Sequence, residues 1–523
     1  MSALPGTYTP RFLPARLPRI CVPIVASNPT DMVQKADAIV RVNSFIEFRL
    51  DYLSKPSLAL QKIKGFVEYH PEVLIVATCR RAAAGGKFRG TIASEIDILV
   101  RAANHGCHLV DLEIETAAQL KPSDFNRLRR SANLILSSHD FRGTRKLEET
   151  FARMNQYPAD FFKVVGTANT LSDNAVMMKF LERHSHEHSM IGVCMGEQGV
   201  ISRVLGVRAG SQFTFGAVGP GEETAPGQIA ARALQDIYRI DQVDAATRVY
   251  GVAGDPVTHS LSPIMLNTAF RRENVNAVYL ALHAKTLSDV LACVREIPIH
   301  GLSITMPYKE EVLKHLDKTD AMTAKIGACN TVVRSQDGKL YGFNTDVTGV
   351  VRPLELRLQL QGAKILVLGA GGAGRAAVFG LKERGADVYV FNRTPGPAQN
   401  LARKARAKAV NKMQLRKMVF DVIINATPVG MEGNRDPLPI SEQEFNAKYF
   451  FEMVYTPAET RMVKIARAKG MHVILGAEMF VQQGARQFEI WSGKPAPTQE
   501  MQRVVEYALI QRAAAKNNEK KPR

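Results

Sequence analysis

Eight short apolar runs, rich in Val, Ile, Leu and Phe, recur through the first half of this chain about every 24 to 36 residues. A stretch with helical periodicity, such as residues 93–103, separates each pair. Eight successive β/α units within about 220 residues predict a parallel TIM barrel. The expected strands are 19–26, 44–51, 73–80, 109–115, 133–140, 160–166, 189–196 and 213–219.

Lys163 and His139 stand near the ends of two successive runs, 160–166 and 133–140. In a TIM barrel the active site lies at these C-terminal strand ends. Burial removes water from a lysine, which lowers the pKa of its amine and frees it to attack a ketone, while a nearby histidine carries protons near neutral pH. A strand-end lysine that merely reaches solvent is the ordinary alternative. The repeating context favours imine chemistry.

Other polar residues gather at the same expected barrel mouth. A guanidinium can hold a carboxylate through two parallel hydrogen bonds, so several arginines at strand ends imply an anionic substrate. The loop 219–228 after the last run adds hydroxyl and amide groups. The candidate binding residues are Glu47, Arg49, Arg80, Arg203, Thr224 and Gln228.

The second half of the chain begins a different architecture. The apolar run 364–368 leads into a Gly-x-Gly-x-x-Gly turn at 369–374 and then into a helical stretch, which predicts a dinucleotide site rather than a purely structural turn. The next run, 388–391, ends in Asn392, Arg393 and Thr394, where a site for NAD would offer a carboxylate. Arginine at that point favours the 2′-phosphate of NADP.

Four further motifs, 259–263, 303–309, 327–331 and 342–346, place polar residues between apolar runs. Each motif alone is equally explained by helix caps and turns. Together they exceed what a generic dinucleotide-binding protein needs.

The first half, from 19 to about 240, resembles type I 3-dehydroquinate dehydratase through the motifs at 47–51, 78–80, 138–141, 163–165 and 225–228. The resemblance implies that Lys163 forms a Schiff base with the substrate ketone and that His139 shuttles protons, while the six candidate binding residues line the pocket. Ala84 stands where the family usually has a glutamate that orients the histidine. This leaves open a barrel whose dehydration is about ten- to a thousandfold impaired.

The second half resembles shikimate dehydrogenase through the four motifs and through 425–431, 453–457, 482–484 and 488–491. The resemblance implies a catalytic pair, Lys309 and Asp346, in which the aspartate keeps the lysine charged and oriented as NADPH reduces the substrate. The implied substrate-binding residues are Ser260, Ser262, Thr305, Asn330, Tyr455 and Gln483. The implied cofactor-binding residues are Gly369, Gly371, Gly372, Ala373, Gly374, Asn392, Arg393, Thr394, Thr427, Met431 and Gly476.

Three departures from the second family are visible. Leu266 replaces a common histidine, Glu452 stands where an aspartate is common, and Pro397 falls where a second NADP-binding basic residue is often seen. The last of these leaves the preference for NADP over NAD open.

Together the halves resemble the bifunctional 3-dehydroquinate dehydratase/shikimate dehydrogenase family of the shikimate pathway, which implies dehydration of 3-dehydroquinate to 3-dehydroshikimate and then reduction to shikimate. Three alternatives are open: a quinate dehydrogenase, a dehydrogenase with an impaired barrel, and a non-catalytic metabolite sensor. The presence of Lys163, His139, Lys309 and Asp346, without an evident DNA-binding segment, disfavours the sensor.

Composition limits the partners. The net charge of +18 would suit nucleic acid, but the basic residues are dispersed and the expected ligands are anions, which a positive field attracts. We expect no metal and no membrane span. The six cysteines lack paired spacing, which indicates reduced thiols and a cytoplasmic protein, with an organelle as the weaker alternative.

We expect an α/β chain with a TIM barrel followed by a two-lobed shikimate-dehydrogenase-like unit. The expected segments are an N-terminal extension (1–18), the barrel (19–240), a linker (241–248), a substrate lobe (249–350), a Rossmann lobe (351–475), C-terminal helices packing on the substrate lobe (476–513) and a disordered tail (514–523).

Overall fold

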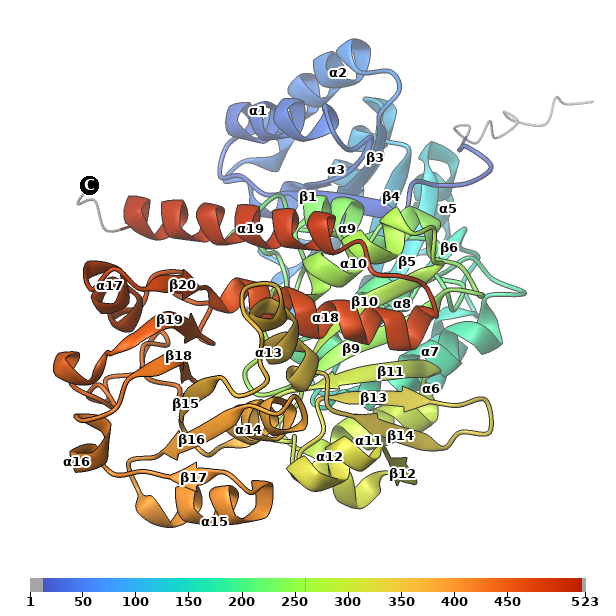
Figure 1. Cartoon of the computed structure of the whole chain (residues 1–523). Helices are drawn as coiled ribbons and strands as arrows, with labels where there is room; N and C mark the ends of the chain where they lie inside the picture. Colours follow the sequence, from blue (N-terminus) through green and yellow to red (C-terminus); the bar gives the residue numbers. More distant parts are fainter. Residues whose placement is uncertain (1–12, 259, 520–523) are drawn as a thin grey trace, which may run out of the picture. The chain divides into compact units, whose positions relative to one another are not determined.

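The computed structural model describes residues 13–258 and 260–519. They form two compact units. The first unit runs to Thr247 and also includes Leu282–Ile297, and the second comprises Arg248–Ala281 and the chain from Pro298 onward. Figure 1 shows the order of the elements along the chain.

The first eight strands form one sheet, in the order β7-β6-β5-β4-β3-β2-β1-β8, in which each pair of neighbours is parallel. The backbone N–H of Gln212, just before β8, donates to the carbonyl of Met190 in β7 at 2.8 Å and so nearly closes the sheet into a barrel. The predicted TIM-like fold is confirmed. The strands are β1 (Ile20–Ile24), β2 (Phe45–Arg49), β3 (Leu74–Thr78), β4 (Leu109–Glu113), β5 (Asn133–His139), β6 (Phe161–Thr167), β7 (Met190–Met195) and β8 (Thr214–Phe215).

Helices connect these strands, as the periodicity predicts. One differs: the sequence predicts a helix over 229–240 that closes the barrel, but the structure has only α9 (Ala231–Asp236). Arg239 then adopts a left-handed conformation (φ 48°) before a separate 3-10 turn at Ile240–Gln242. The other helices here are α1 (Pro29–Val40), α2 (Ala59–Tyr69), α3 (Ile92–Asn104), α4 (Ile114–Ala117), α5 (Pro122–Ser131), α6 (Leu147–Met154), α7 (Asp173–His184) and α8 (Val200–Leu205), and α11 (Leu287–Glu296) clusters with this unit.

The barrel interior changes from apolar to polar along its strands. Alternate side chains of a strand share one face. Nearest the N-terminal strand ends, the buried interior cluster includes Phe45, Leu74 and Leu109. Two positions further along β2 and β4, the inward residues are Glu47 and Asp111, and both are buried. An apolar floor therefore supports a polar mouth.

The second unit contains two six-stranded sheets. The first has the order β10-β9-β11-β13-β14-β12 and is mixed, with β9 and β11 parallel and β13 antiparallel to both of its neighbours. Its strands are β9 (Arg248–Gly254), β10 (Ala277–His283), β11 (Ile299–Ile304), β12 (Lys318–Thr319), β13 (Thr331–Arg334) and β14 (Leu340–Phe343). Helices α10 (Ser262–Arg272), α12 (Ala321–Ile326) and α13 (Asp346–Glu355) accompany it.

The other sheet, β17-β16-β15-β18-β19-β20, is parallel throughout. The chain moves outward from β15 through β16 to β17, then returns to β18 and continues the other way. The carboxyl ends of β15 and β18 thus form a topological switch point, where such sheets bind ligands. The elements are β15 (Lys364–Leu368), α14 (Gly372–Glu383), β16 (Asp387–Phe391), α15 (Pro395–Ala405), β17 (Lys408–Ala409), α16 (Lys412–Leu415), β18 (Phe420–Asn425), β19 (Ala447–Glu452), α17 (Arg461–Ala468) and β20 (His472–Ile474).

The C-terminal segment is two helices, α18 (Gly476–Ser492) and α19 (Thr498–Glu519). Gly493 ends α18 in a left-handed conformation (φ 70°), which glycine adopts without strain. Phe488 of α18 and Met501 of α19 share a buried cluster with residues of α10. Helix α19 continues beyond the expected start of a disordered tail at 514, whereas residues 520–523 and the first twelve residues of the chain lie outside the described part.

Candidate active sites

Lys163, in the middle of β6, lies in the polar mouth of the barrel with only 4% of its surface exposed. Its Nζ donates to Asp111 Oδ2 at 2.8 Å and lies 4.2 Å from the centre of the Phe215 ring. Asp111 Oδ1 in turn accepts from Ser137 Oγ at 2.6 Å and from Arg80 Nη2 at 3.2 Å. Burial raises the pKa of Asp111, but Lys163 and Arg80 outweigh burial and hold that pKa well below its usual range.

His139, at the end of β5, lies beside this group. Its Nδ1 is 2.6 Å from Glu113 Oε1, and the same oxygen is 2.7 Å from Arg80 Nε. Burial and the charge of Arg80 lower the pKa of His139 in spite of Glu113, so the imidazole is neutral near pH 7. A neutral imidazole can accept a proton from substrate, and Glu113 can stabilise the imidazolium that results.

Glu113 supplies a carboxylate beside His139, although the glutamate usual in the family is replaced by Ala84. Ala84 ends a short 3-10 helix, Ala82–Ala84, and has no carboxylate to offer. Glu113, from the neighbouring strand β4, contacts the histidine instead. The impaired barrel that Ala84 suggested is therefore not favoured.

Asp111 and Glu113 were not among the sequence candidates. Their signal is the spacing of two acids within the run 109–115, which places both on one face of a strand. The sequence does not show which residues this face contacts. The register of the strands does, because Glu113 pairs with Ser137 and Ser137 pairs with Lys163.

The predicted arginines differ in their availability to an anion. Arg49 forms two hydrogen bonds with Asp51, at 3.0 and 2.9 Å, and Arg80 is paired as described above. Arg203, on α8, is 2% exposed and donates from Nη2 to the carbonyl of Pro226 at 3.0 Å. Its buried Nε finds no hydrogen-bond partner, and no ion pair involves Arg203 among the described residues. Burial lowers the pKa of Arg203 to about 10.

The remaining predicted barrel residues bond to one another or to close neighbours. Thr78 Oγ1 donates to Glu47 Oε1 at 2.5 Å inside the barrel. In the loop after β8, the backbone N–H and the hydroxyl of Thr224 donate to Gln228 Oε1 at 2.8 and 3.1 Å. The Gln228 amide nitrogen thus remains directed away from Thr224, as a donor.

Lys309 and Asp346 meet in the second unit. Lys309 Nζ donates to Asp346 Oδ2 at 2.6 Å, and Asn330 Nδ2 donates to Asp346 Oδ1 at 2.8 Å. Asn344 Oδ1 accepts the backbone N–H of Asp346 at 3.1 Å, which fixes the start of α13. Asp346 is buried, whereas the Lys309 side chain keeps 23% of its surface exposed, which suits a group that exchanges protons with a bound ligand.

The other predicted substrate residues of this unit lie on several elements. The backbone N–H of Ser262, the first residue of α10, donates to Ser260 Oγ at 3.2 Å, and Thr305 follows β11. Tyr455 stacks on Phe480 with ring centres 4.8 Å apart, and burial raises the pKa of its phenol, so the hydroxyl stays protonated. Gln483, on α18, donates to the Phe480 carbonyl at 2.8 Å.

The glycine turn joins β15 to α14 at the switch point. Gly369 has φ 107°, which favours glycine. A Cβ on Gly374 would approach the Gly369 carbonyl oxygen to 2.3 Å, so this glycine allows helix and strand to pack closely. A Cβ on Gly371, the N-cap of α14, would meet nothing within 4 Å. Open space beside the first N–H groups of a helix fits a pyrophosphate.

The other predicted cofactor residues surround the same sheet edge. Arg393, just after β16, has a 76% exposed side chain whose Nη1 lies 3.5 Å from Asp436 Oδ1, and an exposed ion pair of this kind can give way to a phosphate. Its neighbours are ordered in part by a 2.8 Å hydrogen bond from Asn392 Nδ2 to the Thr394 carbonyl. Thr427 and Met431 follow β18, and Gly476 follows β20. Gly372 and Ala373 belong to the glycine turn and begin α14. These residues fit NADP.

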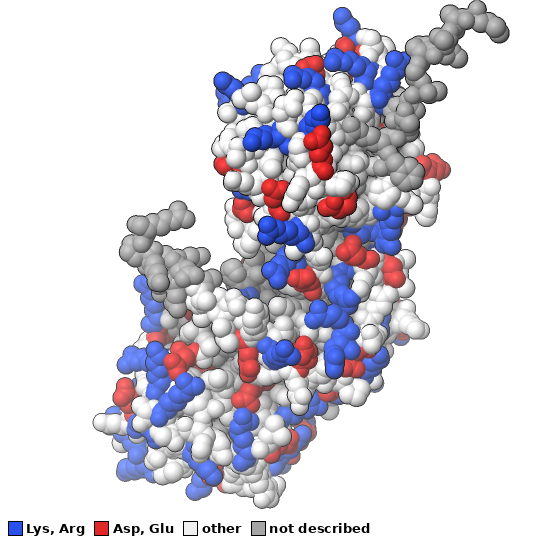
Figure 2. All heavy atoms as spheres, turned by 90° about the horizontal axis from the view of Figure 1, so that it is seen from above, with Lys and Arg blue, Asp and Glu red and all other residues white. Residues whose placement is uncertain are grey.

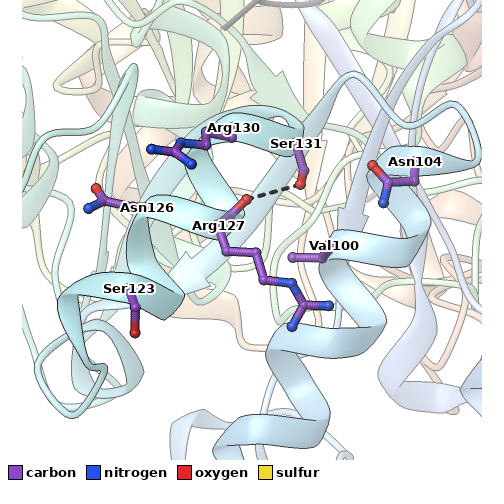
Figure 3. A pocket seen from close by; sticks show the side chains of 7 residues that line it. All are labelled: Val100, Asn104, Ser123, Asn126, Arg127, Arg130 and Ser131. Carbon is purple, nitrogen blue, oxygen red and sulfur yellow. Dashed lines mark hydrogen bonds between the residues drawn. The ribbon is translucent and has the colours of Figure 1, made fainter. Parts of the chain in front are cut away.

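A separate hollow of about 510 Å³ lies on α3 and α5, and none of the predicted site residues lines it. Figure 3 shows Arg127 and Arg130 beside it, with Ser131 Oγ donating to the Arg127 carbonyl at 3.0 Å. On the face of the molecule drawn in Figure 2, Lys and Arg are interspersed with Asp and Glu. Within the described ranges, no group of three or more His, Cys, Asp or Glu could hold a metal, and no helix is long and apolar enough to cross a membrane.

Family models match the two halves of the chain separately, one over the barrel site and three over the second unit. The type I 3-dehydroquinase family model matches residues 20–245. The shikimate dehydrogenase substrate-binding domain matches 252–332, the shikimate/quinate 5-dehydrogenase family matches 354–430, and the shikimate 5′-dehydrogenase C-terminal domain matches 476–506.

Individual relatives cover one half or nearly the whole chain. A bifunctional 3-dehydroquinate dehydratase/shikimate dehydrogenase, chloroplastic, from Arabidopsis thaliana is 34% identical over 501 residues, which are 91% of this chain and 82% of that protein. A shikimate dehydrogenase (NADP(+)) from Pyrococcus furiosus is 38% identical over 50% of this chain and 96% of its own length. A crystal structure of shikimate 5-dehydrogenase from Thermus thermophilus with NADP(H) and shikimate is 36% identical over 50% of this chain and 100% of its own, with a TM-score of 0.47.

Proposed function

This chain belongs to the family of bifunctional 3-dehydroquinate dehydratase/shikimate dehydrogenases, and we propose from that premise that it catalyses two consecutive steps of the shikimate pathway. The barrel dehydrates 3-dehydroquinate to 3-dehydroshikimate. The second unit reduces 3-dehydroshikimate to shikimate with NADPH. The observation that carries the first step is the buried Lys163 and His139 within one network of charged residues. The Lys309–Asp346 pair carries the second.

In the barrel, Lys163 Nζ attacks the ketone carbon of the substrate after losing a proton, and the carbonyl oxygen leaves as water, which gives an imine. His139 then removes a proton from the carbon beside the imine carbon, and the electron pair moves toward the imine nitrogen. When the hydroxyl on the next carbon leaves, His139 returns the proton and water forms. A second water hydrolyses the imine and restores the lysine.

Substrate binding in the barrel requires a cationic hydrogen-bond donor for the substrate carboxylate. We assign this role to Arg203, because it is the one predicted barrel arginine for which the described residues supply no acidic partner. The paired Arg49 and Arg80, together with Glu47, Thr224 and Gln228, complete the proposed pocket and meet the substrate hydroxyls.

In the second unit, bound NADPH supplies the hydride. Lys309 donates a proton to the carbonyl oxygen of 3-dehydroshikimate as it becomes a hydroxyl, and Asp346 holds the ammonium in place. Asn330 orients Asp346, while Tyr455, Gln483, Ser260, Ser262 and Thr305 offer hydroxyl and amide groups to the ring and its carboxylate. Arg393 would hold the 2′-phosphate of the bound cofactor.

The partners that we propose are therefore the small anions 3-dehydroquinate, 3-dehydroshikimate and shikimate, and not nucleic acid. We propose the cytoplasm as the compartment, because all six cysteines are buried and none of them forms a disulfide bond, which suits a reducing environment. Fractionation of the producing cells, with both activities assayed in each fraction, tests this location.

Replacement of each lysine tests whether the two sites act separately. Lys163→Ala should abolish dehydration and borohydride trapping of the imine, with NADPH-dependent reduction of 3-dehydroshikimate intact. Lys309→Ala should abolish the reduction and leave dehydration intact. If either replacement removed both activities from folded protein, the assignment of two sites would be wrong.

A further inference from the structure

Glu452, the last residue of β19, is a fully buried carboxylate in the second unit. No Lys, Arg or His of the described residues forms an ion pair with it. Its oxygens instead accept three hydrogen bonds. Oε1 accepts from Asn425 Nδ2 at 2.7 Å and from the Val454 backbone N–H at 3.1 Å, and Oε2 accepts from Thr460 Oγ1 at 2.7 Å. These donors belong to three separate segments of the chain.

The first segment carries the proposed cofactor residue Thr427. Asn425 Oδ1 accepts the Thr427 backbone N–H at 3.1 Å and its hydroxyl at 2.6 Å. Asn425 can do this only while its amide nitrogen faces the other way, toward Glu452. A carboxylate can only accept hydrogen bonds, so it fixes the orientation of this amide. Burial raises the pKa of Glu452 to about 7, so the position of Thr427 depends on the accepting oxygen Oε1 rather than on a fixed charge.

The second segment borders one proposed substrate residue and one proposed cofactor residue. Val454 precedes Tyr455, whose ring belongs to the proposed substrate site. A Cβ on Gly476, a proposed cofactor residue, would come within 2.4 Å of the Val454 carbonyl oxygen. The hydrogen bond from Val454 to Glu452 thus anchors a strand end that touches both binding regions.

The third segment is the start of α17. Thr460 is its N-cap, because Thr460 Oγ1 accepts the Val463 backbone N–H at 3.2 Å while donating to Glu452. The Thr460 side chain also lies against Gly430, next to Met431: a Cβ on Gly430 would be 3.0 Å from Thr460 Cβ. All three segments that Glu452 joins therefore border proposed binding residues.

We propose that Glu452 is a positioning residue of the reductase. It fixes the position of the segment 425–431, which carries Thr427 and Met431, relative to the segment 453–457, which carries Tyr455, without touching either ligand. This inference rests on the proposed NADPH-dependent reduction. A glutamine at this position would be nearly isosteric, but its amino group would face at least one of the three donors, and a buried donor without an acceptor is costly.

The test compares Glu452→Gln with Glu452→Asp and with a matched control, Glu444→Gln. Glu444 is also buried in this lobe, where it accepts the Ser441 backbone N–H at 2.7 Å, but it bonds to none of the three segments. We expect Glu452→Gln to raise the KM for NADPH and for 3-dehydroshikimate on the order of tenfold. Glu452→Asp keeps the acceptor character and should restore most of the binding. Dehydratase activity of each sample reports that the barrel is intact, and circular dichroism with thermal unfolding reports that the second unit is folded.

Wild-type KM values in Glu452→Gln would overturn the inference. A fall in kcat alone would also overturn it if Glu444→Gln showed the same fall. Either outcome would mean that Glu452 has only a structural role. If Glu452→Gln does not fold, a wild-type KM for both ligands in Thr460→Val, which removes one of the three donors, would overturn the inference equally. Absence of NADPH-dependent reduction in the wild-type chain would instead contradict the proposed function.

Discussion

At the scale of single residues, two acids of β4 control the barrel's lysine and histidine. Burial raises the pKa of Glu113, but His139 and Arg80 outweigh burial and lower it, just as Lys163 and Arg80 lower that of Asp111. Both acids are therefore ionised near neutral pH and act only as acceptors. Each fixes one reacting group: Asp111 holds the amine, and Glu113 holds the imidazole.

Replacement of Glu113 should reveal its role through pH. Glu113 opposes the burial and the Arg80 charge that lower the pKa of His139. In Glu113→Gln the pKa of His139 should fall further, so the acid limb of the dehydratase pH–rate profile moves to lower pH. The loss of orientation should also lower kcat about ten- to a thousandfold. Glu115→Gln, an exposed neighbour, is the control. An acid limb that stays in place in Glu113→Gln would contradict the assignment.

Arg203 gives a second prediction at this scale. A lysine in its place keeps a positive charge but cannot bind a carboxylate through two parallel hydrogen bonds. Arg203→Lys should therefore raise the KM for 3-dehydroquinate on the order of tenfold, with a smaller change in kcat. Steady-state kinetics measures this, with Arg208→Lys as the control in the same region. An unchanged KM would mean that Arg203 does not bind the substrate anion.

At the scale of elements, the turn between β15 and α14 separates structural glycines from a binding glycine. Gly374 is needed for packing, since its added Cβ would strike the Gly369 backbone. Gly371 borders open space at the helix N-terminus. The same residue type thus has two roles within four positions.

Alanine at Gly371 should weaken NADPH binding without loss of stability. The added methyl group has room in the protein but occupies the path of the pyrophosphate, so the Kd for NADPH should rise on the order of tenfold while Tm stays unchanged. Gly65→Ala, which also enters open space but lies on α2 of the barrel, is the matched control. Titration of both variants with NADPH measures the difference. Equal affinities would mean that the pyrophosphate does not approach Gly371.

Some elements of the fold can be predicted from the sequence alone, and others cannot. The eight barrel strands and the strand–glycine–helix turn were predictable because they follow from apolar period and glycine spacing. The shortened α9 depends on Arg239 adopting a left-handed conformation, which residue type alone does not signal. The contact between Glu113 and His139 requires the register of neighbouring strands, which no local pattern states. Availability of arginines is likewise a tertiary property: Arg49 and Arg203 look alike in sequence but differ in their partners.

At the scale of the whole molecule, each compact unit contains one of the two reacting pairs. Lys163 and His139 belong to the first unit, and Lys309 and Asp346 belong to the second. In the proposed sequence, the ketone that the first reaction retains in its product is the group reduced in the second. The net charge of +18 suits a chain whose substrates and cofactor are all anions.

The most direct test of the account supplies the purified chain with 3-dehydroquinate and NADPH, and follows the enone absorbance and the loss of NADPH together. The account predicts that the enone appears, that NADPH is then consumed, and that shikimate accumulates. Consumption of NADPH only when 3-dehydroshikimate is supplied directly would show that the barrel does not dehydrate its substrate. No turnover of either compound would contradict the account as a whole.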